Sequence, residues 1–479
     1  MVLEDLLHPY RHFYRKSPRW CKRSVGQIYA LLPMCVRYGR ALAKARRFLG
    51  ESQWWSWDEH RAYQWREMKA LLEHAYAHVP YYRRVLEEAG IRPEDIRSQG
   101  DWHRLPLLTK DIIREEQEAL VAENMRNRKL SANTGGSTGR PLQLYWERGR
   151  TRSLDRAFMW RQWEWAGFRY GERTAMLRGQ TVRERLWHYD PIDRHLFVDA
   201  YSLSDENMPR IVEKLREFRP VSIQAYPSNL TILAGWMKHE GEPPIEGLKV
   251  VLCGSENLYE AQKRLFDEVF QARVYSWYGH AESVCLAGFC EQQDYYHAYT
   301  EYGYTELVDA QGNPVPWEEG AEGEIVGTGF INRTMPFIRY RTGDFGVVGP
   351  AECTCGRKYP LLVRIPGRRQ EYIITADGRP IALTGLIFGQ HWHAFARIRQ
   401  VQLVQTERGR LTVRIVPGPG FRREEDEQEI REKMQTCVKS GLEVDFEYVD
   451  AIALTARGKH IFIKQSLPPP SKWAGEVGW

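Results

Sequence analysis

The chain has few cysteines and no long apolar run. Eight cysteines are spread over 479 residues, which is too sparse for a scaffold held together by disulfides. A membrane span needs roughly 20 apolar residues, and the best candidate, Ile28 to Val36, is short and contains Pro33. No apolar core with a small-residue cleavage site lies near the N-terminus. We therefore expect a reduced, cytoplasmic protein.

A strong excess of one charge is also lacking over most of the chain. The net charge is +6, and 43% hydrophobic and 27% charged residues are ordinary globular values. The basic excess lies in residues 1–50, where Lys and Arg far outnumber Glu4 and Asp5. Such a segment can bind anionic lipid or nucleic acid, or lie as a solvated helix on its own domain. Nothing else favours nucleic-acid binding as the main function.

One short stretch is rich in glycine and small hydroxyl residues. Glycine permits positive φ and removes the Cβ that blocks close approach, and a ring of bare amide and hydroxyl donors suits phosphate oxygens. The stretch lacks the Gly-Lys-Ser/Thr ending of a P-loop and the dinucleotide fingerprint. A flexible linker is the alternative, but the alternating run 142–146 follows at once and predicts a strand. The predicted phosphate loop is Thr134, Gly135, Gly136, Ser137, Thr138 and Gly139.

Periodicity divides the chain into three regions. Residues 1–60 form a basic, Trp-rich extension, residues 61–370 a large domain, and residues 371–479 a small α+β domain. Between 150 and 290, short apolar strands alternate with helices, which predicts an α/β sheet with ligands at the carboxyl ends of its strands. Beyond residue 300 the pattern becomes β-rich. The fold class is therefore α/β, with mixed sheets and a β-rich subdomain.

Two polar motifs follow predicted strands of the large domain. In Tyr278-Gly279-His280-Ala281-Glu282, a carboxylate just past a strand and beside a phosphate loop is well placed to hold Mg²⁺. An ordinary turn whose Glu caps a helix is the alternative. Arg339 to Asp344 ends a buried strand with two arginines and an aspartate, which indicates waiting anions and hydroxyls, such as those of a ribose. A surface hairpin with a salt bridge is the alternative.

Two further glycines precede cationic residues. Gly367, before Arg368, lies where the β region gives way to the small domain, and can be a hinge or only a turn. Gly458 sets Lys459 on a tight turn after an apolar strand. A loop lysine is usually only solvated, but one carried by a mobile domain could stabilise the charge that gathers on a carboxylate and an α-phosphate.

In this order, the motifs resemble the adenylate-forming superfamily. Within it, they are most similar to the phenylacetate–coenzyme A ligase-like branch, which includes capsular-polysaccharide-type ligases. The likeness covers residues 62–466, from Met68–Arg83 through Leu105–Lys110 to Gly458-Lys459. Each motif alone is weak, and their ordered co-occurrence is specific. The family loop usually ends in Gly-Lys, so Arg140 is a departure that keeps a cation.

The resemblance implies a role for each matching residue. The phosphate loop would wrap the ATP phosphates, Glu282 would hold Mg²⁺, and Lys459 would drive adenylation. Asp344 would bind the ribose hydroxyls and Arg368 would steady the nucleotide, with a hinge near Gln370 about which the small domain rotates. The remaining nucleotide-binding residues would be Gly254, Ser255, Glu256, Tyr278 and Gly279. The acid would lie against Tyr226, Pro227, Ser228 and His280.

A second constellation has metal-ligand chemistry. Cys353 and Cys355 form a Cys-x-Cys knuckle, and Cys290 and His297 could complete a tetrahedral zinc site. Free buried cysteines are common, so plain core packing is the alternative, and we expect Cys253 and Cys285 to be of that kind. Similar members of the branch carry the same Cys…His…Cys-x-Cys order, which favours zinc. Four protein ligands leave no open position, so the metal would be structural.

The sequence therefore predicts an enzyme that uses ATP and Mg²⁺ to convert a small carboxylic acid into an acyl-adenylate. Coenzyme A is the expected acceptor, with an amine or hydroxyl acceptor as the alternative. A nucleotide-binding homologue without activity is the other alternative. Aromatic residues near the acid site suggest an aryl acid only weakly. The sequence leaves the acid, the acceptor and the oligomeric state open, with a homodimer as one candidate.

Overall fold

The computed structural model describes most of the chain. The described residues are 29, 32–133, 142–178, 185–204, 206–256, 258–365, 372–382, 394, 397–418, 420–438, 441–452 and 463–467. The predicted phosphate loop, Arg368, Gln370 and Lys459 lie outside them, as does the side chain of Ser228. Their predicted roles stay predictions.

The N-terminal region is helical, with ends that follow from local sequence. A capping box at Ser56 and Glu59 begins α6, and Pro80 occupies the first turn of α7, where its missing N–H costs nothing. Thr109 caps α8 by accepting a hydrogen bond from the Ile112 amide at 3.3 Å. The helices are α4 (Met34–Arg37), α5 (Gly39–Ser52), α6 (Trp57–His78), α7 (Pro80–Glu88) and α8 (Lys110–Glu115).

Within the described residues, twelve strands form one sheet in the order β11-β12-β13-β14-β10-β9-β8-β7-β6-β3-β5-β4. One half is parallel from β5 to β8: β5 (His195–Val198), β3 (Thr174–Leu177), β6 (Ser222–Ala225), β7 (Val250–Cys253) and β8 (Arg273–Gly279), with β4 (Trp187–Asp190) antiparallel at its edge. The other half is antiparallel: β9 (Leu286–Gly288), β10 (Tyr296–Ala298), β11 (Gly303–Val308), β12 (Glu322–Gly329), β13 (Tyr340–Val348) and β14 (Leu361–Arg364).

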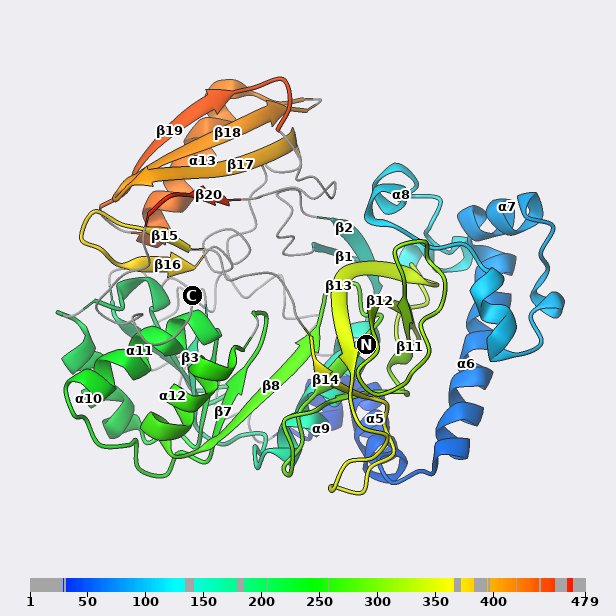
Figure 1. The fold of residues 1–479 in the computed structure, drawn as a ribbon, viewed down its shortest axis with the longest axis horizontal. Helices are drawn as coiled ribbons and strands as arrows, with labels where there is room; N and C mark the ends of the chain where they lie inside the picture. Colours follow the sequence, from blue (N-terminus) through cyan, green and yellow to red (C-terminus); the bar gives the residue numbers. More distant parts are fainter. Residues whose placement is uncertain are drawn as a thin grey trace.

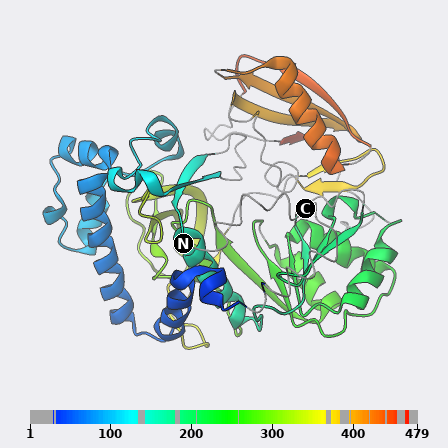
Figure 2. The same ribbon diagram turned by 180° about the vertical axis from the view of Figure 1, so that it is seen from behind.

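The parallel half is covered on both faces, as its apolar strands require. Helices α10 (Met208–Phe218), α11 (Pro227–His239) and α12 (Glu260–Phe270) gather on one side (Figures 1 and 2). Leu177, Ala225 and Cys253 are buried in the core on this face. On the other face, Leu252 and Tyr275 belong to a core that includes residues of α5 and α9 (Thr151–Trp165).

The described part of the basic N-terminal region packs on the large domain. Leu42 and Leu49 of α5 are fully buried in the core shared with α9. Arg46 forms an ion pair with Glu164, and Arg161 donates a hydrogen bond to the Arg46 carbonyl at 3.2 Å. Helix α5 therefore lies on its own domain, the arrangement that the sequence allowed as an alternative to partner binding.

The C-terminal region has a separate small sheet, shown in orange above the parallel half in Figure 1. Its strand order is β19-β18-β17-β20, and Ile430 and Met434 of its helix are fully buried against it. The region is therefore α+β, as predicted. The elements are β15 (Tyr372–Ile374), β16 (Pro380–Ala382), β17 (Ile398–Glu407), β18 (Arg410–Pro417), α13 (Arg423–Val438), β19 (Glu443–Tyr448) and β20 (Ile463–Gln465).

No helix in the described ranges combines the length and apolar character needed to cross a membrane.

A buried ion pair joins the start of β13 to the rest of the large domain. Arg339 and Glu306 are each 2% exposed, with 3.2 Å between Nη2 and Oε1. The guanidinium also donates to the carbonyls of His103 and Leu105, both at 2.7 Å. Removing one partner of such a pair leaves an uncompensated buried charge.

We expect Glu306→Ala to lower the free energy of unfolding by about 3–5 kcal/mol, because Arg339 would stay buried without its carboxylate. Glu246→Ala is the control, since Glu246 and its partner Arg219 are exposed and such pairs contribute less than about 1 kcal/mol. Urea unfolding followed by tryptophan fluorescence measures both. Equal losses in the two variants would contradict the assignment.

Candidate active site

The carboxyl ends of the parallel strands meet at one edge of the sheet, as predicted. Arg178 follows β3, Tyr226 follows β6, and Gly254 and Ser255 follow β7. The Tyr278–Glu282 motif begins with the last two residues of β8. In open α/β sheets, ligands bind at this edge. The residues that the resemblance assigned to adenine and acid thus lie on adjacent strands.

Tyr278 and Asp344 are brought together although 66 residues separate them. The Tyr278 hydroxyl donates to Asp344 Oδ2 at 3.0 Å, and the Asp344 amide donates to Thr342 Oγ1 at 3.1 Å. Burial raises the pKa of Tyr278 well above its usual value, so the hydroxyl remains a donor at neutral pH. The Asp344 carboxylate is held at a fixed position and is only half-buried.

Glu282 lies beside this pair and is 8% exposed. The Tyr340 hydroxyl donates to Glu282 Oε1 at 2.8 Å. His280 Nδ1 is 3.5 Å from Glu282 Oε2, and within the described residues neither His280 ring nitrogen has a hydrogen-bond partner. Desolvation lowers the pKa of His280, so the ring is neutral at pH 7. Its unpartnered nitrogens leave one donor and one acceptor for a ligand.

The strands that flank the predicted phosphate loop are anchored near this motif. β1 (Lys129–Asn133) and β2 (Gln143–Glu147) pair so that Asn133 lies opposite Gln143. Trp146 of β2 donates from its indole nitrogen to the Ala281 carbonyl at 2.9 Å. Both described ends of the loop are therefore fixed on a hairpin that contacts the Tyr278–Glu282 turn.

The two arginines of the Arg339–Asp344 motif have protein partners. The sequence indicated waiting anions, and the structure supplies them as carboxylates of the chain itself: Arg339 pairs with Glu306, and Arg341 with Glu324. Salt bridges are thus present, as in the alternative, but the Arg339 pair is buried and not on a surface hairpin. The predicted contact of Asp344 with ribose hydroxyls stays a prediction.

Arg178 and Trp277, which sequence reasoning did not single out, lie in one row with the predicted site residues Tyr226 and Gly254 on one face of the strand ends. Leu177, Ala225, Cys253 and Ser276 are paired across β3, β6, β7 and β8. Side chains alternate between faces, so the next residue on each strand lies level on the face opposite α10, α11 and α12. These residues are Arg178, Tyr226, Gly254 and Trp277.

The row contains one tightly packed pair, Gly254 and Trp277, and one cation, Arg178. A Cβ on Gly254 would lie 2.3 Å from the Trp277 ring, so the indole occupies the space of the missing side chain. The Arg178 guanidinium donates to Ser255 Oγ at 3.1 Å and lies 5.4 Å from the centre of the Tyr226 ring. The signal in the sequence was a single basic residue directly after an apolar strand, just as the recognised polar motifs follow their strands.

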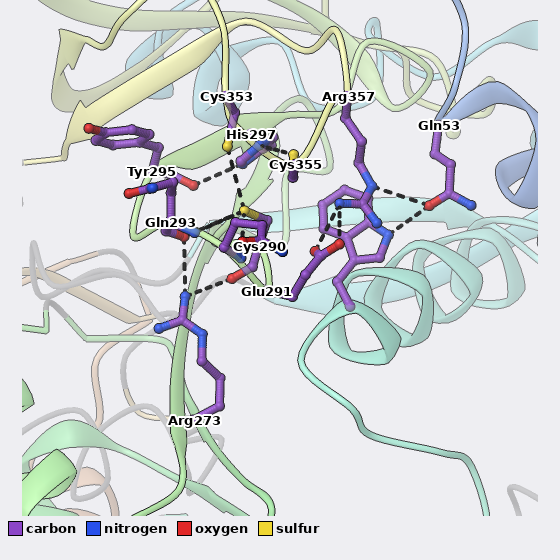
Figure 3. A network of polar contacts seen from close by, with 12 residues as sticks. Gln53, Arg273, Cys290, Glu291, Gln293, Tyr295, His297, Cys353, Cys355 and Arg357 are labelled. Atoms are coloured by element: carbon purple, nitrogen blue, oxygen red, sulfur yellow. Dashed lines mark hydrogen bonds and ion pairs between the residues drawn. The ribbon is translucent and has the colours of Figure 1, made fainter.

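The Cys/His constellation forms a compact cluster (Figure 3). The four candidate ligand atoms of Cys290, His297, Cys353 and Cys355 lie within 4.8 Å of one another. The Sγ atoms of Cys290 and Cys353 are 3.7 Å apart, and Cys355 Sγ is 3.3 Å from His297 Nε2. With Zn–S bonds of about 2.3 Å, a tetrahedral site has sulfur–sulfur edges of about 3.8 Å. The spacing therefore fits zinc.

Neighbouring groups orient the cluster as metal ligands require. His297 Nδ1 contacts the Tyr295 carbonyl at 2.9 Å, which leaves Nε2 for a metal. The amides of Gln292 and Gln293 donate to Cys290 Sγ at 3.3 and 3.2 Å. Hydrogen bonds with Cys290 and with the His297 ring lower the pKa of Cys355. Burial opposes charge on His297, but hydrogen bonds with Cys353 and Cys355 raise its pKa to about 9.

Comparisons with known proteins agree with this geometry. Residues 373–466 match a family model described as the CapK C-terminal domain. The chain is 28% identical over 323 residues to a phenylacetate-coenzyme A ligase of Thermus thermophilus, covering 66% of this chain and 71% of that protein. It is 20% identical over 402 residues to Protein CapK of Staphylococcus aureus, covering 80% and 84%.

A solved structure shares the fold. A 2-hydroxyisobutyryl-CoA ligase in complex with its acyl-AMP and CoA matches with a TM-score of 0.58 and 22% identity, covering 86% of this chain and 91% of that one. The arrangement of a large mixed α/β domain followed by a small C-terminal domain is common to both. The chain thus resembles phenylacetate-coenzyme A ligases and CapK over most of its length, matches the CapK C-terminal domain at its end, and shares the fold of an acyl-CoA ligase, in line with the resemblance that the motifs indicated.

Proposed function

We propose that the protein is an AMP-forming ligase that activates a carboxylic acid with ATP and transfers the acyl group to coenzyme A. The observation that carries this proposal is the pair of contacts at one strand edge, Tyr278 with Asp344 and Tyr340 with Glu282. These contacts hold two carboxylates at the Tyr278–Glu282 turn, which Trp146 of the hairpin flanking the predicted phosphate loop also contacts. Ribose hydroxyls and a Mg²⁺ ion are ligands that such carboxylates suit.

In the first half-reaction, a carboxylate oxygen of the acid attacks the α-phosphorus of ATP, and the bond to pyrophosphate breaks. Negative charge develops on the phosphate oxygens in the transition state. Glu282 would hold the Mg²⁺ that neutralises part of this charge. Lys459 of the small domain would supply a compact ammonium at the same oxygens, and Arg368 would steady the nucleotide.

In the second half-reaction, the coenzyme A thiol attacks the acyl carbonyl and AMP leaves. The relatives named phenylacetate-coenzyme A ligase support this acceptor. An aryl acid lying along Tyr226 and Trp277 is consistent with the same names. An amine or hydroxyl acceptor remains the alternative, which pyrophosphate-release assays with and without coenzyme A would separate.

We expect Asp344→Ala to remove the preference for ATP over 2′,3′-dideoxy-ATP. A hydrogen bond to a charged acceptor contributes about 1.5–3 kcal/mol, so ATP binding should weaken roughly 10- to 100-fold while binding of the dideoxy analogue changes little. Calorimetric titration measures both constants. Asp267→Ala is the control, because Asp267 pairs with Lys263 on the outer helix α12. A retained preference in Asp344→Ala would contradict the ribose contact.

We expect Lys459→Ala to reduce acid-dependent exchange of pyrophosphate into ATP by at least about 100-fold, because the transition state would lose one positioned charge. ATP binding should survive. The control is Lys464→Ala, which removes an exposed lysine of β20 in the same small domain. Unchanged exchange in Lys459→Ala would exclude the catalytic role.

We further propose that the Cys290, His297, Cys353 and Cys355 cluster binds a structural zinc ion. The ligand spacing supports this, and four protein ligands leave no position for substrate. The cluster would join the loop after β9 to the loop before β14, and so hold together the middle of the large sheet.

Purified protein should contain about one equivalent of zinc by metal analysis. Cys355→Ser should lose most of it and melt at a lower temperature, because the metal contributes folding free energy. Cys285→Ser is the control, since Cys285 is buried away from the cluster. Full zinc content in Cys355→Ser, or far less than one equivalent in the wild type, would count against the site.

A further inference from the structure

Arg178 is a cation at the candidate site that none of the proposed chemical steps uses. It follows β3 directly, and within the described residues its contacts are one hydrogen bond to Ser255 Oγ and one face of the Tyr226 ring. No carboxylate of the described chain pairs with it. A guanidinium has five N–H donors, so most of its donors are open to a ligand.

Among the described residues, Arg178 lacks the carboxylate partner that the other arginines near the site have. Arg339 and Arg341 are neutralised by Glu306 and Glu324. Arg178 is instead held by a hydroxyl and an aromatic face, and no carboxylate of the described ranges compensates its charge. A fixed, uncompensated guanidinium is suited to bidentate binding of a planar anion such as a carboxylate.

The strand order separates this cation from the residues proposed to hold Mg²⁺ and ribose. Two strands, β6 and β7, lie between β3 and β8, and neighbouring strands are about 4.8 Å apart. Glu282 follows β8, and Asp344 lies on β13 and contacts Tyr278. The cation therefore lies at the opposite end of the row from the groups proposed to hold Mg²⁺ and ribose.

Aromatic rings fill the row between these two ends. Tyr226 and Trp277 lie on the same face as Arg178, with Trp277 over Gly254. The Trp277 ring also packs edge-on against Trp163 of α9, with 5.3 Å between ring centres. Tyr226 is half-buried, whereas Trp277 is 8% exposed and belongs to the core shared with α9. The row thus offers the Tyr226 ring, backed by Trp277, and a positive charge at its far end.

We infer that Arg178 selects the acid substrate by binding an anionic group remote from the carboxyl that is adenylated. This inference rests on the proposed function and names its substrate class: acids with a second carboxylate or a sulfonate, whose apolar body lies along Tyr226 and Trp277. The second anion stays unmodified during the reaction. Arg178 binds substrate and takes no part in bond breaking.

Matched acids that differ only in distal charge test this inference. Two sets suffice: 4-sulfophenylacetate and 4-carboxyphenylacetate against 4-methylphenylacetate, and adipate against hexanoate. In whichever set wild type reacts faster, the anionic acids should have a higher kcat/KM than the neutral acid, as measured by pyrophosphate release. The sulfonate cannot be adenylated, so it distinguishes the distal anion from the reacting carboxyl, and the two aryl anions show which distal group is preferred.

Arg178→Met should lower the anionic-to-neutral ratio of kcat/KM roughly 10- to 100-fold, the range for one charge-assisted hydrogen-bonded contact. Arg178→Lys should retain part of the preference, because it keeps the charge and loses the fork. The control is Arg264→Met, which removes an exposed arginine of α12 whose partner is Glu260.

Two outcomes would overturn the inference: a wild-type preference for the neutral acids, or an unchanged anionic-to-neutral ratio in Arg178→Met, including the case in which both kinds of acid lose equally. Failure of the proposed function looks different, because no acid would then release pyrophosphate from wild type. In that case, calorimetric binding of adipate and 4-sulfophenylacetate still decides the matter. Binding lost in Arg178→Met supports recognition of the anion, and equal or absent binding in both proteins overturns it.

Discussion

The register of four parallel strands positions the candidate site. Pairing of Leu177, Ala225, Cys253 and Ser276 across β3, β6, β7 and β8 sets the next residue of each strand level on one face. A slip of one residue would turn a strand's side chains to the opposite face, and Arg178 would then point into the core beneath α10, α11 and α12. The buried apolar residues that favour this register therefore also arrange the polar ones.

Local pattern was enough to predict the parts of the site that depend on consecutive residues. The Tyr278–Glu282 turn, the Asp344 position and the strand ends all follow from short motifs, and the structure brings Tyr278 to Asp344. Pairing between distant residues was not predictable in the same way. Glu306 neutralises Arg339 across 33 residues, whereas Arg178 has no such partner in the described part of the chain, and the sequence around each arginine indicates neither.

The Cys/His cluster lies where the sheet changes from parallel to antiparallel. The loop after β9 supplies Cys290, β10 supplies His297, and the loop before β14 supplies Cys353 and Cys355. Beside it, Arg357 bridges Glu291 and Gln53 and lies 4.2 Å from the Trp165 ring centre. The Cys/His cluster and Arg357 together connect α5 and α9 to the middle strands, so they support the place where the two halves of the sheet meet (Figure 3).

Gly254 and Trp277 pack against each other on neighbouring strands. The indole of Trp277 fills the space that a side chain at position 254 would need, so the size of one residue limits the size of the other. In related chains, a larger residue at position 254 should accompany a smaller residue at position 277. Neither position can be enlarged alone, so any redesign of this part of the two strands has to change both residues at once.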